Sequence, residues 1–182
     1  MYNLQNQFPY CFNMPMFNMN PFMFCNSPQS KHINPYNFYF NPFMFPGFKR
    51  PLPKLQDYGP NPFIINIDDA TEQNTNFRTT IWTGKNLQVV LMNLNIGEDI
   101  GLEVHENGDQ FIRIEEGQCL VKMGDTKDNL DFQRIIFDDF VVMIPQGKWH
   151  NIINVGDRPL KLYAIYAPPE HPKGTINENK PS

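Results

Sequence analysis

The feature that most constrains the fold is a series of short apolar or alternating runs, separated by turn residues, between about residues 63 and 172. Many short alternating runs with turn signals between them are typical of a β-sandwich or barrel. Only 68–76 has helical potential, and its Asn-rich end limits a helix there to a turn or two. The sequence therefore predicts an all-β domain, with strands at 63–67, 78–83, 87–94, 100–105, 110–115, 118–123, 132–137, 140–144, 150–154 and 160–167.

A segment of different character precedes this domain. Residues 1–48 contain one charged side chain, Lys31, and ten of the 16 Phe residues, interleaved with Asn, Met and Pro. Frequent proline opposes helices and interior strands, so we expect a low-complexity arm that is disordered or that docks the protein onto an assembly. The Pro-rich residues 49–62 predict a linker, followed by the barrel at 63–175 and a C-terminal tail at 176–182.

Charge and composition exclude several classes of function. Fifteen basic and 19 acidic side chains give a net charge of −4, without a basic cluster, so nucleic acid is not an expected partner. The longest apolar stretches are strand-sized, whereas a membrane helix needs about 18 residues. Three cysteines are too few for a disulfide framework, and the N-terminus lacks the pattern of a secretory signal. These features predict a cytoplasmic protein with no membrane span.

Side chains capable of chemistry concentrate in two stretches. Residues two apart in a strand share a face, so Glu103 and His105 point the same way. A turn at 107–108 brings Gln110 onto the neighbouring strand, beside His105. His150 begins another strand after a turn that contains Pro and Gly.

The second stretch resembles the second motif of the cupin superfamily, G-x5-P-x-G-x2-H-x3-N. Four positions match the motif, and they are Pro145, Gly147, His150 and Asn154. Asp139 stands where the motif has its leading Gly. The match to this motif is therefore nearly complete.

The first stretch resembles the first cupin motif, G-x5-H-x-H-x3,4-E-x6-G. Glu103 stands at the first His position and His105 at the second, whereas Gln110 replaces the Glu and Gly117 is the closing Gly. The usual three His and one Glu carry one negative charge, as do Glu103, His105, Gln110 and His150. The resemblance implies that these four residues bind a divalent metal ion. Mixed nitrogen and oxygen donors suit Zn²⁺, Mn²⁺, Fe²⁺, Ni²⁺ or Co²⁺, and the donor types do not choose among these ions. The alternative is a metal-free barrel in which Gln110 hydrogen-bonds His105 and Glu103 is protonated or paired.

The resemblance covers about residues 76–175 and implies a single-domain cupin, a double-stranded β-helix or jelly-roll-like barrel, that forms a homodimer. The last strand and the residues after it are similar to bacterial cupins described as mannose-6-phosphate isomerase-like. They imply a small-molecule ligand and a metal-dependent isomerase or lyase in which Glu103 moves a proton, or a dioxygenase with Fe²⁺. Two alternatives are a non-catalytic metal- or small-molecule-binding barrel and a spore-coat protein anchored by residues 1–48.

Several other side chains have simpler interpretations. Trp149 is the candidate ligand-binding side chain, and it otherwise packs at the barrel edge. We expect His171 to be a surface loop residue and Cys119 to be a small core residue. Tyr163 and Tyr166 lie on opposite faces of the last strand, so at most one of them faces the barrel interior.

Overall fold

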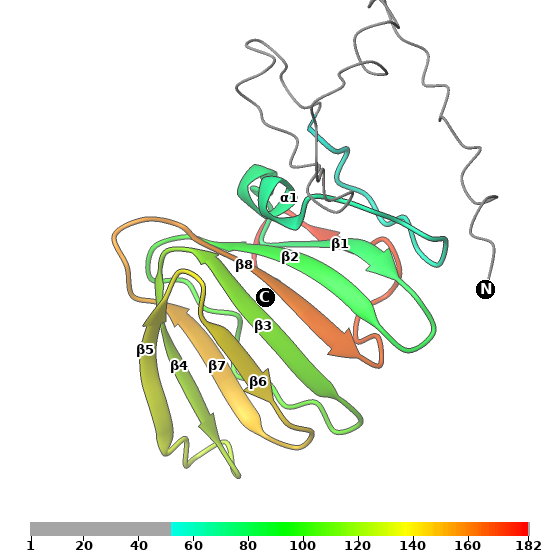
Figure 1. The fold of residues 1–182 in the computed structure, drawn as a ribbon. Helices are drawn as coiled ribbons and strands as arrows, with labels where there is room; N and C mark the ends of the chain where they lie inside the picture. The colour runs from blue at the N-terminus through cyan, green and yellow to red at the C-terminus, as the bar shows by residue number, and fades with distance from the viewer. Residues whose placement is uncertain (1–51, 182) are drawn as a thin grey trace, which may run out of the picture. The chain divides into compact units, whose positions relative to one another are not determined.

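The structure is a computed structural model that describes residues 52–181 (Figure 1). The arm predicted at 1–48 lies outside these residues. One short helix and a series of strands follow one another along the chain, in the order α1 (Ile67–Gln73), β1 (Arg78–Thr83), β2 (Gln88–Leu94), β3 (Asp109–Glu116), β4 (Gln118–Gly124), β5 (Phe132–Phe137), β6 (Val141–Ile144), β7 (Trp149–Asn154), β8 (Leu160–Ala167) and β9 (Ile176–Asn177).

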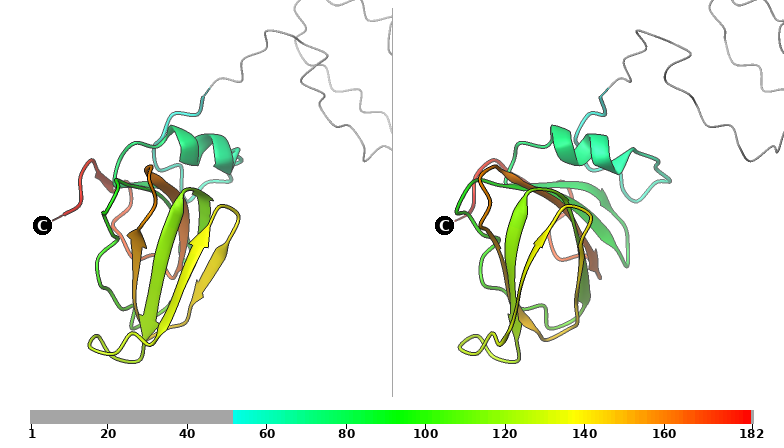
Figure 2. Two further views of the ribbon diagram at one scale, coloured as in Figure 1. Left: turned by 90° about the vertical axis from the view of Figure 1, so that its left-hand side faces the viewer. Right: turned by 60° about the vertical axis from the view of Figure 1, so that its left-hand side comes forward.

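These strands form two antiparallel sheets that face each other (Figures 1 and 2). The larger sheet has the order β6-β3-β8-β2-β1-β9, and the smaller has the order β5-β4-β7. Inward-pointing apolar side chains of both sheets fill the space between them, and they include Val90, Met92, Ile112, Ile114, Val121, Ile136, Ile152, Leu162 and Ala164. The predicted all-β barrel is confirmed.

Residues 63–67 were expected to form a strand and do not. The apolar alternation is present, but residues 63–66 pair with no strand of the described chain, and α1 begins at Ile67. The side chain of Asn66 accepts a hydrogen bond from the Asp68 amide, and two acidic residues, Asp68 and Asp69, follow in the first turn. This is the chemistry of a helix start, because the side chain satisfies a free amide and the carboxylates favour the helix N-terminus.

The predicted strand at 100–105 is also absent as a continuous strand. Gly101 has φ +99°, which interrupts the extended conformation. The segment makes only isolated bridges to β7, one from Asp99 to Ile153 and one from Glu103 to His150. It therefore follows β7 as a broken strand, and its second bridge lies in the candidate site.

The two ends of the described chain both attach to β1. The Tyr58 amide donates to the Ile81 carbonyl at 2.9 Å, and Asp57 Oδ1 accepts from the Thr83 amide at 3.0 Å. At the other end, β9 pairs with the first residues of β1. The described part of the predicted linker, 52–62, is thus packed on the barrel, and the predicted tail begins as a strand.

Side chains on β8 and β4 lie on the faces that the sequence predicts. Tyr166 is buried in the inner core, whereas Tyr163 packs against the outer cluster of Ala70 and Leu91 beneath α1. Cys119 is fully buried, and burial raises the pKa of its thiol to about 12. The thiol is therefore protonated at neutral pH and belongs to the core.

Candidate metal centre

The backbone places Glu103 and His150 directly opposite each other. The Glu103 amide donates to the His150 carbonyl at 3.0 Å, and the His150 amide donates to the Glu103 carbonyl at 2.9 Å. Residues that exchange two hydrogen bonds in an antiparallel pair present their side chains on the same face. The bridge therefore fixes the carboxylate of the broken strand beside the first inward-pointing residue of β7.

His105 completes a group of three converging donors, which we call the trio: Glu103, His105 and His150. Glu103 Oε1 lies 3.4 Å from His105 Nε2 and 3.3 Å from His150 Nε2. Ligand bonds of about 2.0–2.2 Å in a tetrahedral arrangement place neighbouring donor atoms about 3.4 Å apart. The three donor atoms all lie within 4.8 Å of one another. The trio could therefore hold a metal ion.

A backbone carbonyl lies near the Nδ1 atom of one imidazole, and a carboxylate lies near that of the other. His150 Nδ1 lies 2.9 Å from the Lys148 carbonyl, which can only accept, so Nδ1 carries the proton and Nε2 presents its lone pair to the trio. His105 Nδ1 lies 3.4 Å from a carboxylate oxygen of Glu170. Histidine ligands of metals usually have such a carbonyl or carboxylate behind them, because it fixes the ring and raises the basicity of the ligand nitrogen.

Gln110 supplies a fourth donor from the start of β3. Its side chain is buried and lies against His105 and Tyr166. In the described part of the chain, Gln110 Oε1 accepts no hydrogen bond, and neither His105 Nε2 nor His150 Nε2 makes one. Buried polar atoms without partners are costly, by about 1–3 kcal/mol each. A metal ion would satisfy all three, so these residues fit the ion that the cupin motifs imply.

Charge interactions within the trio shift the pKa values of its members. Burial alone would raise the pKa of Glu103, but its close polar and charge interactions with His105 and His150 outweigh it and lower this pKa to about 2. Burial would lower the pKa of His105, but the Glu103 and Glu170 carboxylates outweigh it and raise that pKa. The carboxylate is ionised at neutral pH and stabilises positive charge at the position of the ion.

The segment after β8 adds site residues that the sequence analysis missed. Glu170 lies behind His105, and the ring of His171 contacts Tyr166 edge to face, with 5.1 Å between centroids. The prediction of a surface loop histidine is therefore wrong, since His171 is half-buried and its Nε2 is inaccessible to solvent. The available signal was a Glu-His pair between prolines directly after the strand that carries Tyr166.

Trp149 lies next to His150 in β7, but on the opposite face. The strand alternates between partly buried and buried residues, and His150 belongs to the buried, inward set. A ligand-binding role for Trp149 stays a prediction, and this orientation gives it no support.

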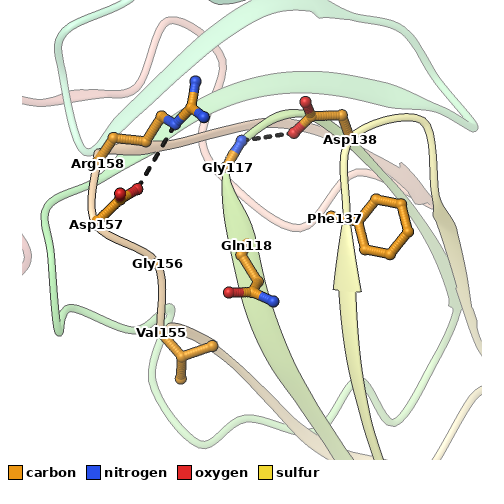
Figure 3. Close-up of a pocket in the computed structure, with 8 residues that line it drawn as sticks. All are labelled: Gly117, Gln118, Phe137, Asp138, Val155, Gly156, Asp157 and Arg158. Atoms are coloured by element: carbon orange, nitrogen blue, oxygen red, sulfur yellow. Dashed lines mark hydrogen bonds and ion pairs between the residues drawn. The ribbon is translucent and has the colours of Figure 1, made fainter.

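A separate surface hollow of about 490 Å³ lies at the far end of β3 from Gln110 (Figure 3). It is lined by Gly117, Gln118, Phe137, Asp138, Val155, Gly156, Asp157 and Arg158. None of the trio lines it. Gly117 has φ +103° and donates its amide to Asp138 at 2.8 Å, which accounts for glycine at this turn. We therefore assign the chemistry to the trio and not to this hollow.

The fold and the trio define a class of protein, a double-stranded β-helix with a potential metal centre. Comparison with known proteins agrees with this class. The family described as Cupin domain matches residues 90–166. The uncharacterized protein YrkC of Bacillus subtilis is 62% identical over 126 residues, which are 69% of this chain and 68% of YrkC. The chain belongs to the cupin family.

Two solved structures are similar to this chain. A crystal structure of a Bacillus halodurans protein is 58% identical with a TM-score of 0.68, over 69% of this chain and 95% of that one. A Klebsiella pneumoniae protein with a double-stranded β-helix domain shares the fold at 16% identity, with a TM-score of 0.50 over 65% of this chain and 100% of that one. Within residues 52–181, no helix is long and apolar enough to cross a membrane.

Proposed function

We propose that this protein binds a divalent metal ion through Glu103, His105, Gln110 and His150, and that it is a metal-dependent isomerase- or lyase-type enzyme for a small oxygenated molecule. The observation that carries the proposal is the convergence of the trio: Glu103 Oε1 lies 3.3–3.4 Å from the Nε2 atoms of both histidines, and all three donor atoms lie within 4.8 Å of one another. Zn²⁺, Mn²⁺, Fe²⁺, Ni²⁺ and Co²⁺ all accept these donors. A bound ion of this kind polarises a carbonyl or hydroxyl oxygen as a Lewis acid.

The protein's own residues would hold and orient both ion and ligand. Glu103 is the only member of the trio with appreciable exposure, 23% for its side chain, so the ligand would approach past its carboxylate. A proton-transfer role for Glu103 belongs to the proposal, but a general base works best when its pKa is near the operating pH. A pKa of about 2 favours the role of metal ligand for this carboxylate.

Exchange of carbon-bound hydrogen with solvent tests the catalytic part of this proposal. Isomerases and lyases of this type remove a proton from a carbon beside a carbonyl. The metal-loaded protein is expected to incorporate deuterium from D₂O into members of a panel of aldoses, ketoses and hydroxy acids, as measured by NMR. His105→Ala should abolish the exchange. Metal-loaded protein that exchanges no member of the panel above the rate of His105→Ala would contradict the catalytic proposal.

Metal affinity is expected to fall on acidification, starting above the usual imidazole pKa. Protons and metal compete for His105 Nε2, and the Glu103 and Glu170 carboxylates raise the His105 pKa from 6.5. Protonation of His105 therefore opposes binding already at pH values above 6.5. Competition titrations with a chelator at several pH values measure this effect. An affinity that stays constant from pH 8 to pH 6 would contradict it.

The remaining alternatives stay predictions. A dioxygenase would use the same residues with Fe²⁺, and a non-catalytic barrel would bind metal without turnover. Homodimer formation and a cytoplasmic location rest on the family resemblance and the composition. The spore-coat and assembly roles depend on residues 1–48, which lie outside the described part of the chain.

A further inference from the structure

We propose that residues 132–143, which comprise β5, β6 and the turn between them, form the interface of a symmetric dimer of this chain. We call this stretch the edge face. In the dimer, the edge face of one copy packs against the edge face of the other about a two-fold axis. The inference is independent of the metal centre, because none of the trio belongs to the edge face. It names a surface, which the resemblance to cupins leaves open.

Exposed apolar side chains are concentrated in the edge face. Among residues 52–181, 13 large hydrophobic side chains are exposed, and six of them lie in this short stretch. Each of the six is 43–62% exposed, and they are Phe132, Ile135, Phe137, Phe140, Val141 and Met143. Single exposed apolar residues are normal on a protein surface, whereas a group of them indicates a binding surface.

The six side chains form one continuous patch. β5 and β6 border a groove of about 320 Å³, and five of the six side chains line it. The sixth, Phe137, contacts Phe140 with 4.6 Å between ring centroids. Arg134 is the only charged residue that lines the groove. The edge face is therefore an apolar surface with a depression that side chains of a partner can enter.

The size of the patch suits one half of a dimer interface. An aromatic side chain can bury about 150–250 Å², so six large side chains that are about half exposed present on the order of 500 Å² of apolar surface. A standard interface buries about 800 Å² per partner, and about 65% of a homodimer interface is apolar, which is again on the order of 500 Å². This agreement favours a second copy of the chain as the occupant.

The backbone of the edge face is also open to association. β6 is an edge of the larger sheet and β5 is an edge of the smaller one (Figure 1). Proteins usually protect exposed edges with several charges, proline or very short strands. β5 has one charged residue and β6 has none, and neither contains proline. The other two edges of the described sheets are protected, since β9 has two residues and Asp99 and Glu103 bridge to β7.

Two charged side chains of the edge face complement each other about a two-fold axis. Arg134 and Asp138 are both exposed, and neither forms an ion pair with a described residue. They lie two residues to either side of Ile136. A two-fold axis near Ile136 reverses the strand direction, so it brings Arg134 of each copy opposite Asp138 of the other. The one cation of the groove thereby gains an anionic partner.

Sedimentation equilibrium of the full-length protein tests this interface. Wild type is expected to be a dimer at micromolar concentration. Ile135→Lys should raise the dissociation constant at least about 100-fold, because the symmetric interface buries the unpaired charge twice. Ile64→Lys is the matched control, since it makes the same change at an isoleucine that is 97% exposed and lies outside the edge face. It should dissociate as wild type does.

Met143→Lys makes the same test from β6 and decides the matter if Ile135→Lys does not fold, as judged by circular dichroism. A monomeric wild type would overturn the proposal, because the edge face would then serve another occupant. An assembly that the folded edge-face variants leave unchanged would also overturn it, because other residues would hold that assembly together.

Exchange of charges tests the two-fold arrangement. Arg134→Asp and Asp138→Arg are each expected to weaken the dimer at least about tenfold, since like charges then face each other. An equimolar mixture of the two variants should dimerise as wild type does, because opposite charges meet at both contacts of the mixed dimer. A mixture that dimerises no better than the single variants would overturn the arrangement. Should Asp138→Arg fail to fold, Arg134→Asp must weaken the dimer more than Arg134→Ala does.

Discussion

Glu103→Gln is expected to abolish stoichiometric binding of a divalent metal. The substitution preserves shape but removes the only formal negative charge of the trio, whose oxygen lies 3.3–3.4 Å from both imidazole Nε2 atoms. Even loss of a residue behind a metal ligand costs about 10–100-fold in affinity, so loss of this charged ligand should cost at least about 100-fold. Elemental mass spectrometry after loading and dialysis measures the bound metal.

Glu106→Gln is the matched control for this prediction. The same chemical change falls three residues further along, at an exposed position whose backbone carbonyl accepts a hydrogen bond from Gln146. It should leave the metal content intact. His105→Ala and His150→Ala should lose metal as Glu103→Gln does. Full metal content in Glu103→Gln would show that the carboxylate is not a ligand, whereas a wild-type protein that binds no metal would favour the metal-free barrel.

Most of the fold followed from the alternation of inward and outward side chains. β1, β5 and β8 have the predicted bounds, and along β8 buried and partly buried residues alternate regularly. The segment 63–67 has the same alternation, but a strand needs a partner with free hydrogen-bonding groups, and none of the described strands supplies one there. The helix signal at Asn66, a capping side chain followed by two acidic residues, overlaps the apolar pattern and prevails over it.

Local spacing indicated Glu103, His105 and Gln110, and the resemblance to the second cupin motif added His150, but neither indicated the residues around them. Glu103 and His105 share a face because they are two apart, and Gln110 lies just beyond the turn that follows them. Glu170 and His171 reach the same region from the segment after β8, where Glu170 lies beside His105 and His171 lies against Tyr166. Their proximity depends on how the larger sheet pairs and on the hydrogen bonds between Gln88 and His171, which no local spacing encodes.

Asn154→Ala is expected to destabilise the barrel by about 3–4 kcal/mol, because the side chain satisfies several buried backbone groups at once. Asn154 is 1% exposed, and its Oδ1 accepts from the Gly156 amide at 3.0 Å. Its Nδ2 lies at 2.9–3.1 Å from three backbone carbonyls, those of Leu94, Asn95 and Arg158. Alanine leaves these groups without their partner. The loss in free energy of unfolding can be measured by urea denaturation.

Asn151→Ala provides the comparison within the same strand. Asn151 lies on the other face of β7, and its Oδ1 accepts no hydrogen bond in the described part of the chain, so its replacement should cost less than about 1 kcal/mol. Both variants should bind metal when folded, because the trio donors are untouched. Asn154 would thus stabilise the loop that follows β7, whereas His150, four residues earlier, would bind the metal ion. Equal unfolding midpoints for the two variants would contradict this division of roles.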